Sequence, residues 1–167
     1  IIQDLLEFSR EREPSKAIGD LNGVINKALS ILANEFRLHR VSVEKRLSDD
    51  LPSVLLDGNQ MEQVFINFFM NAIEAIQGQG SISVRSFKDQ DNKGVVVEIE
   101  DSGIGIPQEH LARIFEPFFS TKAKGTGLGL AVNYGIIQKH GGQIKVSSQP
   151  GRGTTMTIRL PYDQATA

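Results

Sequence analysis

Two glycine-dense segments enclose the stretch that most constrains this chain. They are DSGIGIP, which begins at Asp101, and GTGLGLAV, which begins at Gly125, and the residues between them include the run FEPFFSTK. A loop of this length inside a compact domain is uncommon unless it is functional, and a mobile segment over a ligand is one usual reason. Glycines that open a helix leave unpaired N–H groups and a positive dipole end, which suit phosphates. The stretch from Asp101 to Leu130 therefore predicts a nucleotide-binding segment.

Length and composition limit the other possibilities. The 167 residues are enough for one ordinary domain with a full core. A formal net charge of −2 gives no broad basic surface, so we expect no nucleic-acid partner. The absence of cysteine excludes disulfides and cysteine-based metal sites and fits a cytoplasmic location. No apolar run approaches the roughly 20 residues of a membrane span, although the parent protein can still be membrane-anchored.

The hydrophobic pattern predicts an α+β fold. Apolar residues at helical spacing indicate long helices over residues 20–36, 57–77 and 126–137 and a short one over 107–113. We expect Asp20 and Asp57 to cap the first two of these helices. Alternating patterns and short apolar runs indicate strands over residues 41–47, 54–56, 81–87, 95–101, 143–148 and 154–160. We therefore expect a two-layer α/β sandwich, in which about five strands form a mixed sheet covered on one face by three helices.

The two ends of the chain are predicted to lie outside this domain. Residues 1–14 carry apolar side chains at helical spacing until Pro14 ends the pattern. This helix either packs on the same domain or is the end of a longer helix from a dimerising element. The catalytic unit is expected to cover residues 15–161, and residues 162–167 are expected to form a disordered tail.

Taken alone, each glycine motif has an ordinary explanation. GTGLGLA is superficially similar to a dinucleotide-binding fingerprint, but it follows a polar loop and lacks a βαβ unit. DSGIG by itself indicates a tight turn. The combination is more specific, because Asp101 at a strand end can accept from an exocyclic amine. Asn67 and Asn71, spaced i, i+4 on one helix face, can offer amide oxygens to a hard cation such as Mg²⁺.

Four segments in order carry a resemblance to a known family. QVFINFFMNAIEAI, DSGIGIP, IFEPFFSTK and GTGLGLAV resemble the N box, first glycine box, F box and second glycine box of sensor histidine kinase catalytic domains, within the GHKL superfamily. The NAIEAI and STK forms are most similar to kinases of the nitrogen-regulator type. The resemblance implies the Bergerat ATP-binding fold, with ATP and Mg²⁺ as cofactors. It also implies transfer of the γ-phosphoryl group to a histidine, followed by relay to a response-regulator aspartate.

The resemblance implies a role for particular residues. Asp101 would accept from the adenine amine, Thr154 would support the base through water, and Gly105 would let the base approach the backbone. Asn71 matches the Mg²⁺ ligand. Asn67 stands where the ATP-hydrolysing relatives carry a glutamate as general base, and an amide cannot take a proton, which favours transfer over hydrolysis.

The remaining site residues follow from the same motifs. Arg113 and Lys122 are expected to neutralise charge on the transferred phosphoryl group, so the predicted catalytic residues are Asn67, Arg113 and Lys122. Glu62 and Glu74 are interpreted as solvated helix carboxylates. The predicted nucleotide contacts are Asn67, Asn71, Asp101, Gly103, Gly105, Ile106, Lys122, Gly125, Thr126, Gly127, Leu128, Gly129, Leu130 and Thr154.

None of the three histidines is predicted to accept the phosphoryl group. His39, His110 and His140 lack the family's acceptor context, a histidine followed by an acidic residue on a long helix. LLEFSR resembles the end of the dimerisation and phosphotransfer helix, so the acceptor is expected upstream, in a homodimeric parent protein whose isolated fragment need not dimerise. A GHKL ATPase and a non-catalytic, nucleotide-gated binding module remain the alternative hypotheses.

Overall fold

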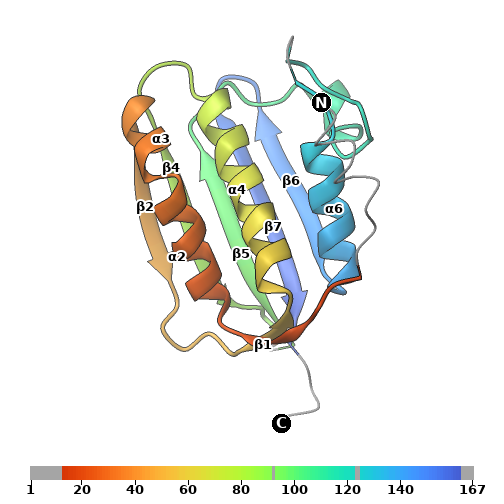
Figure 1. The fold of residues 1–167 in the computed structure, drawn as a ribbon. Helices are drawn as coiled ribbons and strands as arrows, with labels where there is room; N and C mark the ends of the chain where they lie inside the picture. Colours follow the sequence, from red (N-terminus) through yellow and green to blue (C-terminus); the bar gives the residue numbers. More distant parts are fainter. Residues whose placement is uncertain (1–12, 92, 123–124, 163–167) are drawn as a thin grey trace.

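The computed structural model describes residues 13–91, 93–122 and 125–162, and a mixed five-stranded sheet forms its centre (Figure 1). The strand order is β2-β4-β5-β7-β6. Strand β2 pairs in parallel with β4, and the other neighbours pair antiparallel, which confirms the predicted mixed sheet. The strands are β2 (Val41–Leu47), β4 (Gly80–Lys88), β5 (Gly94–Asp101), β6 (Gln143–Gln149) and β7 (Gly153–Pro161).

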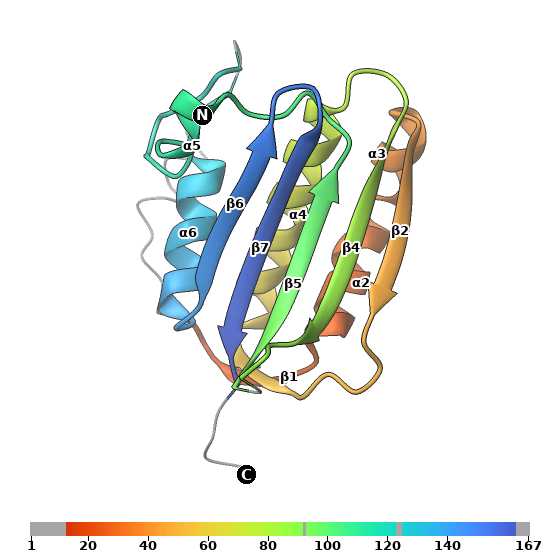
Figure 2. The ribbon, with the colours of Figure 1, turned by 180° about the vertical axis from the view of Figure 1, so that it is seen from behind.

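Three helices lie side by side over one face of this sheet (Figure 1). They are α2 (Leu21–Ile31), α4 (Gly58–Ala75) and α6 (Gly129–Lys139), as the sequence predicted. Figure 2 shows the sheet from behind, where no described helix covers it. None of the described helices combines the length and apolar character needed to cross a membrane.

The core lies between the helices and the covered sheet face. Phe65 and Phe69 on α4 are fully buried and stack with ring centroids 6.4 Å apart. Ile82 and Val84 on β4 are fully buried as well. Because α4 buries apolar side chains over a wide arc, it lies in the middle of the helical layer, and its polar side chains are placed by that packing.

Two predicted helix starts differ in their capping. Asp57 caps α4 as predicted, because its Oδ1 accepts from the N–H groups of Asn59 and Gln60 at 3.0 and 3.1 Å. Asp20 precedes α2 but makes no side-chain capping bond, so that part of the prediction is wrong.

The helix expected over residues 20–36 is divided in the structure. Helix α2 ends at Ile31, and a separate helix, α3, covers Ala33–Leu38. The apolar stripe continues across the break, because Leu32 and Phe36 are both buried. A stripe of apolar residues indicates which face of a helix is buried, but it does not indicate where the helix axis changes direction.

A small second sheet closes the end of the domain opposite the tip of β5. Strand β1 (Ala17–Gly19), which the sequence pattern did not predict, pairs antiparallel with β3 (Val54–Leu56). Nearby, the N–H of Asp57 donates to Nε2 of buried His140 at 2.9 Å, and Nδ1 of His140 contacts the carbonyl of Ile136 at 2.8 Å. A carbonyl only accepts, so Nδ1 carries the proton and His140 is neutral. Burial correspondingly lowers the pKa of His140.

Other boundaries differ by a few residues. The short helix α5 covers Gln108–Leu111, so it ends before Arg113, and α6 begins at Gly129 because Gly127 has a φ of +69° that no right-handed helix accommodates. Tyr162, expected in the tail, packs on the core, and its N–H donates to the carbonyl of Lys93 at 3.3 Å. The expected helix over residues 1–12 and the rest of the tail, 163–167, lie outside the described residues.

Candidate functional site

The carboxylate of Asp101 lies at the end of the central strand β5. The residue is only 8% exposed, and its Oδ1 accepts from the N–H of Gly103 at 2.8 Å. Burial raises the pKa of Asp101 above its ordinary value, and the backbone N–H groups of Gly103 and Thr154 partly oppose that shift. A buried carboxylate with a remaining acceptor site is suited to bind a hydrogen-bond donor from a ligand.

Thr154 lies opposite Asp101 in the β5–β7 register, which brings two predicted base-contacting residues together. Its hydroxyl lies 2.9 Å from Oγ of Ser148 on β6. Ser148 Oγ also donates to the carbonyl of Gly153 and accepts from the N–H of Ile106, each at 2.8 Å. Because the only proton of Ser148 goes to Gly153, the Thr154 hydroxyl donates to Ser148 and keeps its lone pairs as acceptors.

Ser148 was missed by the sequence reasoning. It joins the segment after Asp101 to β6 and β7, and so fixes Ile106 relative to Thr154. A signal was present, because Ser148 follows Ile144 and Val146 on the core-facing side of β6 with a period of two. A polar residue at the end of such an apolar row indicates a buried hydrogen bond.

Gly103 and Gly105 are required by the packing of the chain itself. A Cβ at Gly103 would lie 2.8 Å from the backbone of Ala75 at the end of α4. At Gly105, where φ is +73°, it would lie 2.1 Å from the carbonyl oxygen of Gln149. Both glycines therefore hold the loop against α4 and the β6–β7 turn, and their predicted contact with a base stays a prediction.

The two amides of α4 have different partners. Asn67 Nδ2 donates to Oδ1 of Asn133 on α6 at 3.0 Å. Asn71 Oδ1, one helical turn further along, accepts from Nζ of Lys122 at 3.2 Å. The same ammonium forms an ion pair with Glu74, so Glu74 is not simply solvated as predicted. The structure thus brings Asn71 and Lys122 together, as a shared site requires.

Arg113 lies apart from that group. Its Nε donates to Glu116 at 3.0 Å, and its guanidinium carbon lies 4.5 Å from the ring centroid of Phe119. The structure gives it no contact with Asn71 or Lys122. The side chains of Arg113 and Glu116 are each more than half exposed, so their pair contributes little and is easily exchanged for another anion.

The aromatic residues of the FEPFFSTK run also divide into two kinds. Phe115 and Phe119 are partly buried against the core. Phe118 is 64% exposed with a φ of +66°. Its N–H donates to the carbonyl of Gly127 at 3.0 Å, which ties this run to the second glycine segment.

The second glycine segment leads into the start of α6. A Cβ at Gly127 would lie 2.5 Å from the carbonyl carbon of Phe118, so only glycine fits there. Thr126 Oγ1 accepts from the N–H of Leu128 at 3.4 Å, and Leu128 is buried. Gly129 is the first residue of α6, although Leu128 supplies no side-chain cap. Unpaired N–H groups of this first turn can therefore bind an anion.

The ends of β5, α4 and α6 that carry these groups lie at the same end of the domain (Figure 1). Among the described residues, no group of three or more His, Cys, Asp or Glu side chains could hold a metal by itself. A cation held here would need ligand phosphates and water beside the amide oxygen of Asn71, which is how Mg²⁺ is usually bound with nucleotides. Asn71 Oδ1 already contacts one cation, the Lys122 ammonium, so its orientation fits that role.

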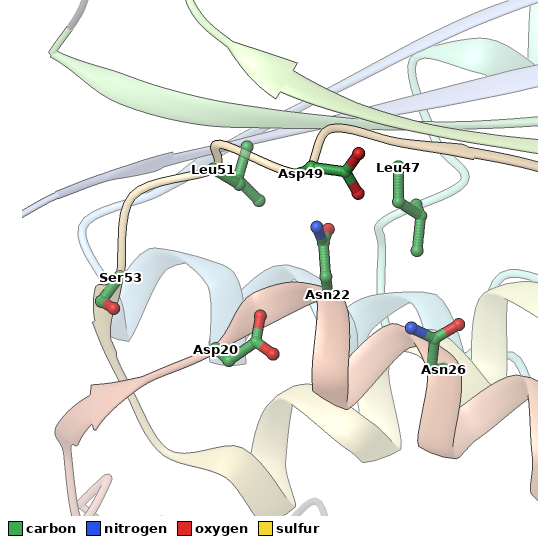
Figure 3. A pocket seen from close by; sticks show the side chains of 7 residues that line it. All are labelled: Asp20, Asn22, Asn26, Leu47, Asp49, Leu51 and Ser53. Carbon is green, nitrogen blue, oxygen red and sulfur yellow. The ribbon is translucent and has the colours of Figure 1, made fainter.

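A hollow at the other end of the sheet is not part of this site (Figure 3). Asp20, Asn22 and Asn26 of the α2 region face Asp49 and Leu51 across it. Its amides already have partners in the chain, since Asn22 bonds to the Ser48 carbonyl and the Ser86 hydroxyl, and Asn26 accepts from Lys45. These contacts join α2 to the sheet and explain the polar lining.

Comparisons with known proteins agree with this geometry. The family model described as histidine kinase-, DNA gyrase B- and HSP90-like ATPase matches residues 56–164. The sensor histidine kinase ZraS of Escherichia coli (strain K12) is 38% identical over 163 residues, which are 98% of this chain and 35% of that protein. The chain thus spans about a third of the length of that curated relative.

Several solved structures are similar to this chain in both fold and sequence. The catalytic domain of histidine kinase ThkA has a TM-score of 0.80 and 32% identity, covering 89% of this chain and 96% of that one. Full-length ShkA in complex with AMPPNP has a TM-score of 0.86 and 26% identity, covering 99% and 36%. ThkA in complex with response regulator protein TrrA has a TM-score of 0.81 and 28% identity, covering 97% and 46%. The chain therefore belongs to the histidine kinase-, DNA gyrase B- and HSP90-like ATPase family, as a catalytic ATP-binding domain of sensor histidine kinases.

Proposed function

We propose that this domain binds Mg·ATP and transfers its γ-phosphoryl group to a histidine of a dimerisation and phosphotransfer domain in the same protein. One observation carries the proposal. Asp101 is a buried carboxylate at the strand end, held by backbone N–H groups and adjacent to Thr154, in a chain whose family is defined by ATP binding. Burying such a carboxylate is unfavourable unless a ligand donor uses it.

The adenine end of the site, defined as Asp101, Gly103, Ser148 and Thr154, recognises the base. Asp101 accepts from the exocyclic amine of adenine, and the Thr154 hydroxyl supports the base through water. Guanine presents a carbonyl in place of that amine, which would leave Asp101 facing another acceptor. The site therefore selects ATP over GTP, because an unpaired buried polar group is costly.

The phosphate end, defined as Asn71, Arg113, Lys122 and Gly125–Gly129, holds the triphosphate. Asn71 contributes its oxygen to the cation, while Lys122 and Arg113 exchange their carboxylate partners for phosphate oxygens. Bound Mg²⁺ would neutralise charge on the terminal phosphates. Asn67 cannot act as a base, so the domain does not activate water. In the transfer, the bond from the γ-phosphorus to ADP breaks as a bond to a neutral imidazole nitrogen forms.

The partners follow from the same proposal. ThkA forms a complex with a response regulator, which supports a receiver domain as the next acceptor of the phosphoryl group. The acceptor histidine belongs to the dimerisation and phosphotransfer domain of the parent protein, which forms a homodimer.

Phosphotransfer in trans tests the proposal. The chain is mixed with γ-labelled ATP and a full-length parent protein that carries Asp101→Asn and an intact acceptor histidine. We expect acid-labile, alkali-stable label on the full-length protein. Steady release of phosphate without labelled protein would instead indicate an ATPase, and ATP binding without either product would indicate a nucleotide-gated binding module.

A further inference from the structure

Asn133 is a fully buried polar residue on α6 that no motif of the sequence singled out. It makes two hydrogen bonds to α4. Its Nδ2 donates to the carbonyl of Val64 at 3.2 Å, and its Oδ1 accepts from Nδ2 of Asn67 at 3.0 Å. Asn133 therefore contacts a predicted site residue directly while lying outside the site itself.

These two bonds determine which way the Asn67 amide points. The carbonyl of Val64 can only accept, so the atom of Asn133 that faces it must be the nitrogen. The oxygen of Asn133 then faces Asn67, and only the nitrogen of Asn67 can donate to it. The orientation follows from the chemistry of a backbone carbonyl, and it does not depend on telling nitrogen from oxygen in either side chain.

The start of α6 encloses the same amide from a second position. A Cβ at Gly129 would lie 3.9 Å from both Cγ and Nδ2 of Asn67. The nitrogen side of Asn67 is therefore flanked by Gly129 and Asn133, one helical turn apart on α6. Within the described part of the chain, Oδ1 of Asn67 has no hydrogen-bond partner and is left as the atom that a ligand can reach.

The neighbouring amide has the same polarity. Asn71 lies four residues further along the same face of α4, and its Oδ1 contacts the Lys122 ammonium. In both amides, therefore, the oxygen is the atom on the side where a cation can bind: it contacts the Lys122 ammonium in Asn71, and it is left without a partner among the described residues in Asn67. Oxygen suits a hard divalent cation or a donor, whereas an amide nitrogen would instead donate to phosphate.

We propose that Asn133 is a positioning residue that holds Asn67 with its carbonyl oxygen toward the bound divalent cation. This inference rests on the proposed Mg·ATP site and adds to it how Asn67 acts, namely as an acceptor beside Asn71. Residues that orient metal-binding side chains through hydrogen bonds typically change metal affinity 10–100-fold when they are replaced.

Two substitutions separate this role from a purely structural one. Asn133→Asp can still accept from Asn67, and in its neutral form its O–H replaces the donor to Val64. Asn133→Leu is of similar size but makes neither bond, so the Asn67 amide is free to turn. Both are expected to lower stability, which urea unfolding measures, whereas only Asn133→Leu changes the orientation of Asn67.

The readout is the Mg²⁺ dependence of ATP binding by calorimetry, using the full chain at a series of Mg²⁺ concentrations. We expect Asn133→Leu to raise the Mg²⁺ concentration at half-maximal effect about 10-fold or more. Binding of ATP without metal should stay unchanged, and Asn133→Asp should stay within about 2-fold of the native chain. Native Mg²⁺ dependence in Asn133→Leu, or equal losses in both variants, would overturn the inference.

A measurement on the native chain covers the case in which the leucine variant does not fold. The side-chain NH₂ of Asn67 should show NMR contacts to the Hα protons of Gly129 both without ligand and with Mg·AMPPNP. Loss of those contacts on binding would show that the amide turns and would overturn the inference. A native chain that binds no ATP, or binds it without Mg²⁺ dependence, would instead contradict the proposed function.

Discussion

The adenine end and the phosphate end of the site are built in different ways. At the adenine end, Asp101 and Thr154 are 8% and 6% exposed and are held by bonds to β6, β7 and the adjacent loop. At the phosphate end, the side chains of Arg113 and Lys122 are 55% and 43% exposed and pair with carboxylates of the domain itself. The proposed recognition site for the base is therefore preformed in the sheet, whereas the cations proposed to contact the phosphates must first leave acidic partners.

This difference has an energetic consequence. A buried group that is held by hydrogen bonds cannot move to a new partner, so changing it should remove binding outright. Exposed ion pairs contribute about 0.2–1 kcal/mol, so exchanging one for a phosphate contact costs little. Substitutions at the two ends should therefore separate into losses of affinity and losses of rate.

The largest effect is expected at the adenine end. Asp101→Asn presents an N–H₂ group where the adenine amine needs an acceptor, so ATP binding should fall by at least ~10²-fold and become unmeasurable by calorimetry. Glu100→Gln, one residue earlier and solvent-exposed, is the matched control and should bind normally. Near-native affinity in Asp101→Asn would contradict the assignment of the adenine contact.

A large loss of rate is expected at the phosphate end. Lys122→Ala should slow phosphotransfer on the order of 10²-fold, because a positive charge beside the transferred group acts mainly in the transition state. ATP affinity should change much less. Lys27→Ala, which removes a surface pair with Glu62 on α4, is the control. A loss of affinity with an unchanged rate at saturating ATP would show that Lys122 acts only in binding.

An intermediate effect is expected for Asn71, the amide of the phosphate end. Asn71→Ala should reduce the Mg²⁺-dependent part of ATP binding roughly 10-fold while leaving metal-free binding and the fold intact. Calorimetry with and without Mg²⁺, together with circular dichroism, measures both parts. Unchanged Mg²⁺ dependence would remove Asn71 from the metal site.

Because Asp101 is buried, the difference in stability between the native chain and Asp101→Asn should depend on pH. Because burial raises the pKa of Asp101 in the folded chain, the folded carboxyl holds its proton better than the unfolded one. The protonated carboxyl of Asp101 therefore contributes to stability below the ordinary pKa of 3.8. This contribution is lost as the pH rises through the pKa that Asp101 has in the folded chain. Asp101→Asn, which has no charge to bury, should therefore be more stable than the native chain at neutral pH. That advantage, measured by urea unfolding across pH, should shrink on acidification.

The smallest effect is expected for the pair that holds Lys122 in the free domain. Glu74→Gln weakens this competing contact, so ATP binding should tighten by at most about fivefold. Glu62→Gln, which breaks the pair with Lys27 on the same helix, should leave the affinity unchanged. Weaker binding in Glu74→Gln would show that Glu74 positions Lys122 for the nucleotide.

Much of the fold could be predicted because its signals are local. The apolar arc of α4, the alternation in the strands and the capping carboxylate of Asp57 each depend on neighbours a few residues away. The break after Ile31 and the pairing of β1 could not be predicted, since both depend on contacts between distant segments. The pairing of β1 with β3 joins residues 35 to 39 positions apart, and a three-residue strand has too short a pattern to detect.

The site shows the same division between local and distant information. Ordered motifs predicted roles for Asp101, Asn71 and Lys122, and the structure places the last two in contact. Ser148 and Asn133 were missed, because each is a single polar residue whose importance lies in a bond to another element. Glu62 and Glu74 were interpreted as solvated, and both form ion pairs, because a helix pattern does not show that Lys27 and Lys122 lie beside them.

The sequence by itself determined the family, the layers of the fold and the chemical types at the site, because these depend on residue identity and short-range spacing. Only the tertiary structure decided how those groups are held. It placed Asp101 against Gly103 and Thr154 and occupied Lys122 with Glu74. It also turned the Asn67 amide by bonding it to Asn133. The physical reason is that hydrogen bonds and burial depend on which distant side chains meet, and that is fixed only when the helices pack on the sheet.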